Sequence, residues 1–405
     1  MKNIRGIGVK NYRVLRDVSL GSVVPMPKQD ETKGMPFGTG DPLSPLTVVI
    51  GRNGYGKSSL CDAFGFIGDC LRSDAEHACS IRGGFFDIIS NCHDKQSDSK
   101  LEFQILYDNL QYSLSIASDK YNTPYVYAET LSHVSADFTG NDSMNFFASC
   151  GEGKVVRPNA ESVSDIKLAD KRRLVLSTLG NLNQFPDIVE FRRFLDSWYL
   201  SYFKPDAARQ PSQAIPQKHL STSGNNLANV VLYWEKEHRA ELDLLFDRVF
   251  GKVLGIERLE TKTTEDGRLL LRFFERGTDR PLYASQMSDG TLKLVAYTLL
   301  LGDPEPPPFV CFEEPENGLY HKLLGAFVDE IRKHCDKNGN SQFFITTHQP
   351  YLVDALKPEE VWILEKGNDG FASMKRASED AVVRNMVEGG MPLGALWFSE
   401  YLESY

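Results

Sequence analysis

The most constraining stretch of this sequence is VVIGRNGYGKSS, residues 48–59. Its first three residues are β-branched and suit a buried strand. The glycines that follow permit backbone angles at which successive N–H groups turn toward one anion. From Gly51 to Ser58 the spacing fits G-x-x-x-x-G-K-[ST], a phosphate-binding loop between a strand and a helix. The chain is therefore expected to bind a nucleotide at a strand-to-helix turn.

Each part of this loop has an expected role. Lys57 supplies a positive charge to the β- and γ-phosphates, and the Ser58 hydroxyl is offered to Mg²⁺. A helix predicted over residues 57–72 directs the positive end of its dipole to the same place. The cofactors expected on this basis are ATP and Mg²⁺. The expected nucleotide-binding residues are Arg52, Asn53, Gly54, Tyr55, Gly56, Lys57, Ser58 and Ser59.

Composition narrows the class of protein. The chain has 405 residues, of which 41% are hydrophobic, and it contains no apolar run long enough for a membrane span. A net charge of −10 argues against a protein that coats nucleic acid indiscriminately. The seven cysteines form no CxxC pair, and the first ten residues do not resemble a secretory signal. The sequence therefore predicts a cytoplasmic protein with reduced thiols and no membrane partner.

Periodicity predicts an α/β fold with an antiparallel β subdomain and a helical insertion. Two strands joined by a bend open the chain, and a meander of three short strands follows near residues 100–132. Residues 160–250 have a helical period, and a hairpin is expected around Asp266-Gly267. From residue 290 helices and strands alternate, which indicates a parallel sheet. The predicted division is 1–150 for an N-terminal lobe, 151–280 for the insertion and 281–405 for a C-terminal lobe.

A second group of candidate residues lies in the last third of the chain. The apolar strand 309–312 ends in Glu313 and Glu314, which are suited to holding Mg²⁺ and to orienting a water molecule. Upstream, the stretch SDGT at residues 288–291 precedes a long apolar helix. Downstream, a strand ends in TTH, with His348 as its last residue. Carboxyl ends of parallel strands meet at one sheet edge, so these groups are expected near the phosphate loop.

These four stretches resemble the motifs of a known class. GRNGYGKSS, SDGT, CFEEPENGLY and ITTHQP are similar to Walker A, the signature, Walker B with the D-loop, and the switch histidine of ABC-type ATPases. Within that class the chain resembles the RecF/SMC/OLD-like group of AAA-type ATPases, many of them found in bacterial anti-phage defence systems. The motifs cover residues 1–72 and 283–365. The resemblance implies an ABC-ATPase-like P-loop fold and a homodimer, or higher homo-oligomer, that sandwiches ATP between its subunits.

The resemblance also implies roles for individual residues. Ser58 and Glu313 would hold Mg²⁺, Glu314 would position the attacking water, and His348 would sense the γ-phosphate; Glu314 and His348 are thus the expected catalytic residues. The signature residues expected to bind nucleotide across the dimer are Ser288, Asp289 and Gly290.

The sequence departs from the family pattern at several positions. Walker B usually ends in Asp-Glu, whereas this chain has two glutamates, so the metal carboxylate reaches one methylene further. The signature carries Asp289 where a glycine is usual, which brings an acid near an incoming phosphate. Gln104 is a candidate for the glutamine that contacts Mg²⁺. Tyr12 and Arg13 are candidates for contacting adenine.

Alternatives from other classes remain open. An ABC transporter subunit is disfavoured because 230 residues separate Ser58 from Ser288. A DNA-repair or chromosome-associated RecF/SMC-like ATPase is a second possibility, although residues 160–280 contain no sustained heptads. A scaffold that binds nucleotide without hydrolysing it is a third. Nucleic acid is a candidate partner through a basic track formed by Lys171, Arg172 and Arg173 with Arg192 and Arg193, for which a solvated helix face is the favoured interpretation.

The C-terminal segment bears on what uses the energy of hydrolysis. About forty residues follow the last predicted strand, whereas a nuclease domain needs on the order of 100 residues to form a core. The stretch GGMPLGALWFSE, residues 389–400, is suited to docking on the ATPase or on another protein. The chain is therefore expected to hydrolyse ATP without cutting nucleic acid and to control a separate effector protein, for which a nuclease is the leading candidate. The scattered acids expected to be solvated are Glu379, Asp380, Glu388, Glu400 and Glu403.

Overall fold

The computed structural model describes residues 2–23, 40–90, 100–134, 144–156, 163–249, 255–278, 280–337, 341–399 and 401. The chain forms two compact units of unequal size. The phosphate-loop unit comprises Met1–Trp198, Pro308–Glu313 and Gln342–Tyr405, and the signature unit comprises Tyr199–Pro307 and Glu314–Ser341. Each unit is built from segments that are distant in sequence. The predicted division into two lobes and an insertion stays a prediction.

A largely parallel sheet carries the phosphate loop. Within the phosphate-loop unit its strands run in the order β15-β16-β3-β17-β18. The first four are parallel to one another, and β18 is antiparallel to β17. All five residues of β3 are buried, as expected for a strand covered on both faces. The bounds are β3 Leu46–Ile50, β15 Phe309–Glu313, β16 Gln342–Thr347, β17 Val361–Lys366 and β18 Ala372–Arg376.

An antiparallel sheet forms the second layer of this unit. Its strands follow the order β2-β1-β4-β5-β6-β7-β8-β9, so the predicted opening pair and the predicted meander belong to one sheet. The bounds are β1 Ile4–Tyr12, β2 Leu15–Gly21, β4 Leu101–Tyr107, β5 Leu110–Ser118, β6 Pro124–His133, β7 Met144–Ser149, β8 Glu152–Val156 and β9 Val163–Lys167. The predicted α/β fold class, with a P-loop strand and helix beside an antiparallel β subdomain, is confirmed.

Helix α1 (Lys57–Arg72) joins the two sheets through aromatic contacts. On one side Phe64 lies 5.1 Å from the Phe309 ring of the parallel sheet, measured between centroids. On the other side Phe66 stacks on Phe103 of the antiparallel sheet at 5.2 Å. The two sheets also meet directly, because the Ala372 N–H donates to the Val14 carbonyl. A helix that is apolar on several faces is stable only when buried in this way.

The remaining helices of this unit are short. They are α2 Ala75–Ser80, α3 Phe85–Ile88, α4 Val175–Leu179, α5 Pro186–Asp196, α11 Pro350–Val353, α12 Ala381–Glu388 and α13 Leu393–Phe398, with the 3-10 turns Pro358–Glu360 and Ala377–Glu379. Two expectations need correction here. The sheet does not finish with β17, because the glycine turn at Gly370 returns the chain as β18. Residues 160–250 are only partly helical, since they include β9 and two further short strands.

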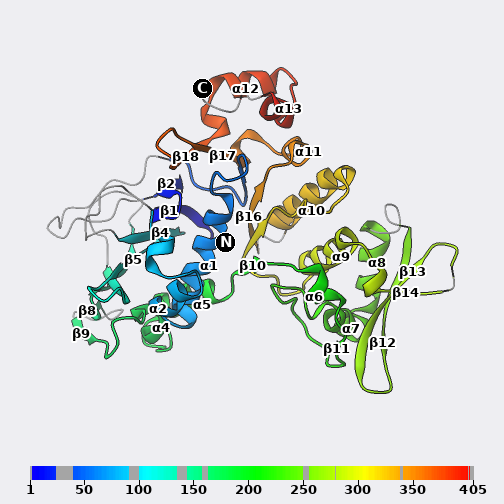
Figure 1. The fold of residues 1–405 in the computed structure, drawn as a ribbon, viewed down its shortest axis with the longest axis horizontal. Helices are drawn as coiled ribbons and strands as arrows, with labels where there is room; N and C mark the ends of the chain where they lie inside the picture. The colour runs from blue at the N-terminus through cyan, green and yellow to red at the C-terminus, as the bar shows by residue number, and fades with distance from the viewer. Residues whose placement is uncertain are drawn as a thin grey trace. The chain divides into compact units, whose positions relative to one another are not determined.

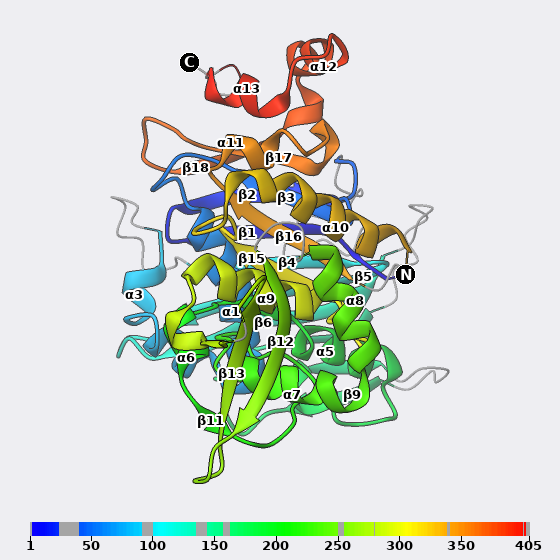
Figure 2. The same ribbon diagram turned by 90° about the vertical axis from the view of Figure 1, so that its right-hand side faces the viewer.

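The signature unit combines helices with a long hairpin, drawn in green in Figure 2. Strands β12 and β13 pair antiparallel around a turn at Gly267, whose φ is 78°, as the sequence predicts. The strands are β10 Tyr199–Ser201, β11 Ser212–Gln213, β12 Ile256–Thr263, β13 Arg268–Glu275 and β14 Leu282–Tyr283. The helices are α6 Pro205–Arg209, α7 Leu227–Glu237, α8 Arg239–Val249, α9 Asp289–Leu301 and α10 Leu324–Lys337, with the 3-10 turns Ala284–Gln286 and His321–Leu323.

A buried carboxylate, Glu129 on β6, caps helix α4. Its side chain is fully buried and accepts hydrogen bonds from the N–H groups of Val175 (2.5 Å) and Leu176 (3.0 Å). The Tyr112 hydroxyl donates a third hydrogen bond at 3.0 Å. Burial raises the pKa of Glu129 to about 7, and the three donors offset only part of that shift. The folded state therefore holds a proton on Glu129 at pH values where the unfolded chain has released it.

This raised pKa predicts a pH-dependent stability. Stability from protonated Glu129 is present below 4.5, the ordinary pKa of a glutamate in an unfolded chain, and is lost as the pH rises through about 7. Between pH 5 and pH 8 the free energy of unfolding should fall by on the order of 2–3 kcal/mol more in the parent than in Glu129→Gln. Urea denaturation at both pH values measures the difference. The half-exposed Glu190→Gln serves as the control, and an unchanged pH dependence in Glu129→Gln would contradict the assignment.

Candidate nucleotide-binding site

The phosphate loop requires its glycines for two different reasons. Gly54 and Gly56 have φ values of 81° and 113°, in the left-handed region that favours glycine. Gly51 has no room for a side chain, because a Cβ there would lie 2.7 Å from the Leu364 carbonyl oxygen of β17. The loop residues Arg52, Asn53, Gly54 and Ser58 are exposed, while Tyr55, Gly56 and Ser59 are half-buried. A loop backbone open to solvent at the start of α1 is the geometry that an anion needs.

Lys57 is buried beneath this loop. It is the first residue of α1 and only 4% exposed, and its Nζ donates to the carbonyl oxygens of Gly51 (2.7 Å) and Arg52 (3.3 Å). The ammonium group is thus held inside the curve of the loop rather than extended into solvent. A compact cation in that place complements the charge of a bound phosphate chain.

Strand register brings Glu313 and the switch-histidine strand to the edge that carries the loop. Glu313, at the end of β15, pairs with Thr346 of β16, and Thr346 pairs with Val49 of β3. Neighbouring strands are about 4.8 Å apart, so Glu313 lies about 10 Å across the sheet from β3. Helix α1 packs behind this edge: the Cys311 thiol lies 3.4 Å from the Cys61 sulfur. Both sulfurs are buried, which fixes β15 against the helix that begins at the loop.

His348 directly follows β16 and is half-buried. The turn that carries it is held by a hydrogen bond in which the Gln349 N–H donates to Thr347 Oγ1 at 3.0 Å. Helix α11 then begins at Pro350. Because β16 lies between β15 and β3, His348 leaves the sheet between the carboxylate strand and the loop strand. Three of the four sequence motifs therefore meet at one edge of one sheet.

The C-terminal segment docks on the helix that follows His348 (Figure 1). The Gly394 N–H of α13 donates to Asp354 Oδ1 at 2.9 Å, and a Cβ on Gly394 would lie 2.1 Å from the Pro350 carbonyl oxygen. Leu393 and Leu396 are buried in the same contact region, and Phe398 is 80% exposed. Residues 389–400 were expected to dock on the ATPase or on another protein, and docking on the ATPase is what the structure shows.

The signature belongs to the signature unit. Ser288 caps α9, and its Oγ accepts a hydrogen bond from the Thr291 N–H at 3.2 Å. Gly290 approaches the D-loop so closely that a Cβ would lie 2.0 Å from the Gly318 carbonyl oxygen. Serine is favoured at this capping position, so a structural role for Ser288 is independent of any phosphate contact.

The two Walker B glutamates fall on opposite sides of the boundary between units. Glu313 is the last residue of its segment in the phosphate-loop unit, and Glu314 opens a segment of the signature unit. Glu314 has a φ of 42°, uncommon for a residue other than glycine, and its Oε2 accepts from Asn317 Nδ2 at 3.0 Å. Positive φ values outside glycine concentrate at functional sites, which agrees with a special role for this residue.

The structure separates the two candidates for contacting adenine. Tyr12 is fully buried and its hydroxyl donates to Asp62 at 2.7 Å, so its ring has no face available to a base and that interpretation is wrong. Arg13 is half-exposed and pairs with Asp62 at 2.9 Å. The neighbouring Val14 touches the phosphate loop, since a Cβ on Gly56 would lie 2.6 Å from its side chain. Arg13 therefore stays a candidate nucleotide contact.

Asp62 is a residue that sequence patterns did not single out. Besides Tyr12 and Arg13 it binds Arg82, whose Nε lies 2.7 Å from Asp62 Oδ1. Arg82 is 8% exposed and also binds Asp69 at 2.8 Å. The cluster fastens the turn between β1 and β2 to α1, one turn beyond Ser58. Partners separated by 20 to 50 residues leave no spacing signal in a single sequence.

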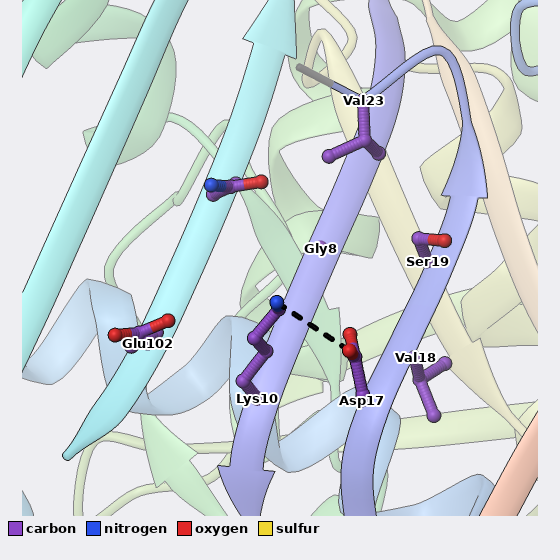
Figure 3. Close-up of a pocket in the computed structure, with 8 residues that line it drawn as sticks. Gly8, Lys10, Asp17, Val18, Ser19, Val23 and Glu102 are labelled. Carbon is purple, nitrogen blue, oxygen red and sulfur yellow. Dashed lines mark ion pairs between the residues drawn. The ribbon is translucent and has the colours of Figure 1, made fainter. Parts of the chain in front are cut away.

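Gln104 lines a small cavity of about 170 Å³ on the antiparallel sheet, shown in Figure 3. Its neighbours there include Gly8, Glu102 and the ion pair of Lys10 with Asp17, whose charged atoms are 3.4 Å apart. The cavity is lined by β1, β2, β4 and Val23, and no residue of the phosphate loop belongs to the lining. The cavity thus offers no support for Gln104 as the glutamine that contacts Mg²⁺.

The proposed basic track is largely neutralised where the structure shows its contacts. Arg172 binds Asp170 at 2.8 Å and Glu76 at 2.6 Å. Arg192 pairs with Asp196 at 3.5 Å, and Trp198 is 8% exposed, too buried to stack on a base. These contacts favour a salt-bridged surface over a nucleic-acid track, although only Arg192 and Arg193 lie on a helix and residues 171–173 lie in the turn before α4.

The described residues also bear on other functions. No group of three or more His, Cys, Asp or Glu side chains among them is arranged to hold a metal ion. In the C-terminal segment Asp380 is engaged as the cap of α12, while Glu400 and Glu403 lie outside the described residues. The helices described are all too short or too polar to cross a bilayer.

A glycine loop at the start of a helix, a buried lysine beneath it and a carboxylate two strands away at the same sheet edge define a P-loop nucleotide-binding protein. The family model described as "AAA domain, putative AbiEii toxin, Type IV TA system" matches residues 46–354, or 309 of 405 residues. The chain belongs to this family of AAA-type ATPase domains. The match extends from the strand before the loop to the helix after His348.

Solved structures and curated proteins add little to this assignment. An SMC head bound to the C-winged helix domain of ScpA is 14% identical, with a TM-score of 0.48 over 92% of this chain and 96% of the other. The SMC head domain from Thermotoga maritima is 15% identical, with a TM-score of 0.41 over 92% and 98%. No curated protein matches the sequence.

Proposed function

We propose that this protein hydrolyses ATP in an ATP-bridged homodimer and thereby controls a separate effector protein in an anti-phage defence system. One observation carries the enzymatic part: the phosphate loop, Glu313 and His348 leave neighbouring strands at one edge of one sheet. A loop that only binds nucleotide has no need for a carboxylate and an imidazole at the same edge. Hydrolysis of a metal-bound triphosphate by a positioned water requires both groups.

The donor set fits a magnesium nucleotide. Ser58 is exposed at the start of α1, and the half-buried Glu313 ends the strand two places away. Hydroxyl and carboxylate oxygens are the protein ligands that Mg²⁺ accepts, usually with several waters retained. When bound, the metal would offset charge on the β- and γ-phosphate oxygens. The longer arm of Glu313, relative to the aspartate of the family, suits contact through a metal-bound water.

The remaining roles are proposed from the motif that each residue matches. Lys57 compensates the phosphate charge from beneath the loop, Glu314 orients the attacking water, and His348 hydrogen-bonds the γ-phosphate. Ser288, Asp289 and Gly290 receive the γ-phosphate of the partner subunit's ATP. In this arrangement the presence of the γ-phosphate decides whether two subunits are joined, which is how one hydrolysis event changes the assembly.

The part that acts on a target is assigned in this proposal to a separate protein. Helix α13 is fastened to α11, with the Gly394 N–H donating to Asp354, so this segment serves the ATPase itself. The family to which this chain belongs carries a toxin and toxin–antitoxin description, which agrees with a place in a defence system.

Purified protein tests the enzymatic part directly. Phosphate release with ATP and Mg²⁺ is expected at a rate per subunit that rises with protein concentration, because the active site is completed by a second subunit. EDTA should abolish the release. The same protein incubated with plasmid, single-stranded DNA or tRNA, in Mg²⁺ or Mn²⁺, should leave all three intact. Tight ATP binding without phosphate release would favour the non-hydrolysing scaffold instead, and cleavage of nucleic acid would remove the need for a separate effector.

A further inference from the structure

The signature of this protein carries a negative charge at the helix end where a phosphate is proposed to bind. Asp289 is the first residue of α9, and its side chain is 64% exposed. A carboxylate in the first turn suits the helix dipole of one subunit. The same carboxylate repels a triphosphate brought to that helix end, since like charges at short range cost free energy even near a protein surface. The proposed function brings the γ-phosphate of the partner subunit's ATP to this helix end.

Arg209, the last residue of α6, lies against this carboxylate. Its guanidinium donates to Asp289 Oδ1 and, from the same nitrogen, to the Met287 carbonyl oxygen at 2.9 Å. The other terminal nitrogen donates to Asp206 at 2.8 Å. The Arg209 side chain is only 20% exposed, whereas Asp206 is 95% exposed. Arg209 is therefore fixed on both the backbone and the acid of the signature, although 80 residues separate it from Asp289.

Another cation near this helix end, Lys293, is engaged elsewhere. Lys293, one turn further along α9, donates through Nζ to the Asn317 carbonyl oxygen at 2.8 Å. Glu316, Asp289 and Glu314 surround it, and burial lowers the pKa of Lys293. Arg209 and Lys293 thus face the carboxylates of Asp206, Asp289, Glu314 and Glu316. Removal of Arg209 would leave Asp289 without its ion-pair partner among the described residues.

We propose that Arg209 is a positioning residue of the signature, which neutralises Asp289 so that the start of α9 accepts the γ-phosphate of a second subunit's ATP. The proposal rests on the proposed function and adds a residue from outside every ATPase motif. It explains how a signature with an acid in place of glycine still receives an anion. It also gives α6, a short helix of the region predicted as an insertion, a part in the nucleotide site.

A double-mutant cycle tests the proposal because it separates charge neutralisation from direct phosphate binding. The variants are Arg209→Ala, Asp289→Asn and the double variant, with Arg268→Ala as a matched control at the exposed ion pair of the β12–β13 hairpin. Three quantities are measured: fluorescent ATP binding by the monomer, dimer formation with a non-hydrolysable ATP analogue, and phosphate release. Thermal unfolding checks that each variant folds.

Arg209→Ala should bind ATP within about twofold of the parent, since the phosphate loop is untouched, but lose about tenfold or more in dimer formation and in phosphate release. Asp289→Asn should restore both in the double variant to within about threefold of Asp289→Asn alone. Raising the ionic strength should shrink the Arg209→Ala defect, because salt screens the repulsion that the proposal invokes. Arg268→Ala should behave as the parent.

Two results would overturn the proposal while leaving the proposed function standing. One is parent-like dimer formation and turnover in Arg209→Ala. The other is a defect that Asp289→Asn does not relieve, which would make Arg209 a phosphate ligand or a purely structural residue. A parent protein that neither dimerises with the ATP analogue nor releases phosphate would overturn the proposed function and this inference together.

Discussion

Replacing Lys57 by alanine is expected to weaken ATP binding about 100-fold or more, equal to about 2.7 kcal/mol, and to remove phosphate release with it. The physical reason is the position of the ammonium group, 4% exposed and bonded inside the curve of the loop. A phosphate chain bound there would lose the one cation that lies beneath the loop backbone in the described structure. Fluorescent ATP titration of the folded variant measures the loss.

The control for this substitution must separate charge from folding. Lys10→Ala removes a lysine from the same unit at a side chain that is 47% exposed, and it should bind ATP as the parent does. Thermal unfolding of both variants checks that neither loses its fold. If folded Lys57→Ala still binds ATP with parental affinity, the assignment of residues 51–59 as the nucleotide site is wrong.

The second large effect concerns the pair of glutamates. Glu314→Gln should lower turnover about 100-fold or more while ATP still binds, because an amide cannot accept the proton of the attacking water. With hydrolysis blocked, ATP should hold the subunits together as a stable dimer, visible by size-exclusion chromatography or sedimentation. Glu313→Gln should instead raise the Mg²⁺ concentration needed for activity, because it removes a charge from the metal site.

The comparison between the two variants assigns the roles. Both residues are half-buried and adjacent, so a nonspecific effect on folding would affect the two variants similarly. A parental rate in Glu314→Gln would transfer the water-positioning role to Glu313 or to another residue. An ATP-stabilised dimer in Glu313→Gln but not in Glu314→Gln would reverse the two assignments.

Local sequence patterns were enough to predict the framework of the phosphate-loop unit. The β-branched run before Gly51 forms β3, and the helix predicted over 57–72 is α1 with those bounds. The sequence also predicted that these strand ends meet at one sheet edge, while the register that aligns Glu313 with Thr346 and Val49 is seen only in the structure. For β3 and α1 the information lies within a few residues of the element, which is the range over which periodicity is informative.

What the sequence could not show depends on contacts between distant segments. Tyr12 has the chemistry of a base-stacking residue, and only its burial against α1 excludes that role. Arg209 carries no motif, and its relation to Asp289 exists only because α6 and α9 pack together. Strand β18 was missed because its five residues are short and mixed in polarity, and pairing with β17 rather than intrinsic propensity stabilises them.

The docking of α13 on α11 connects the C-terminal segment to the turn that carries His348. The Gly394 N–H donates to the Asp354 carboxylate, and a Cβ on Gly394 would collide with the carbonyl oxygen of Pro350, which lies two residues after His348. Helix α13 is thus packed directly against the helix that follows the switch-histidine turn. Any side chain introduced at position 394 would therefore displace α11, and a change in the C-terminal segment would act on the turn that carries His348.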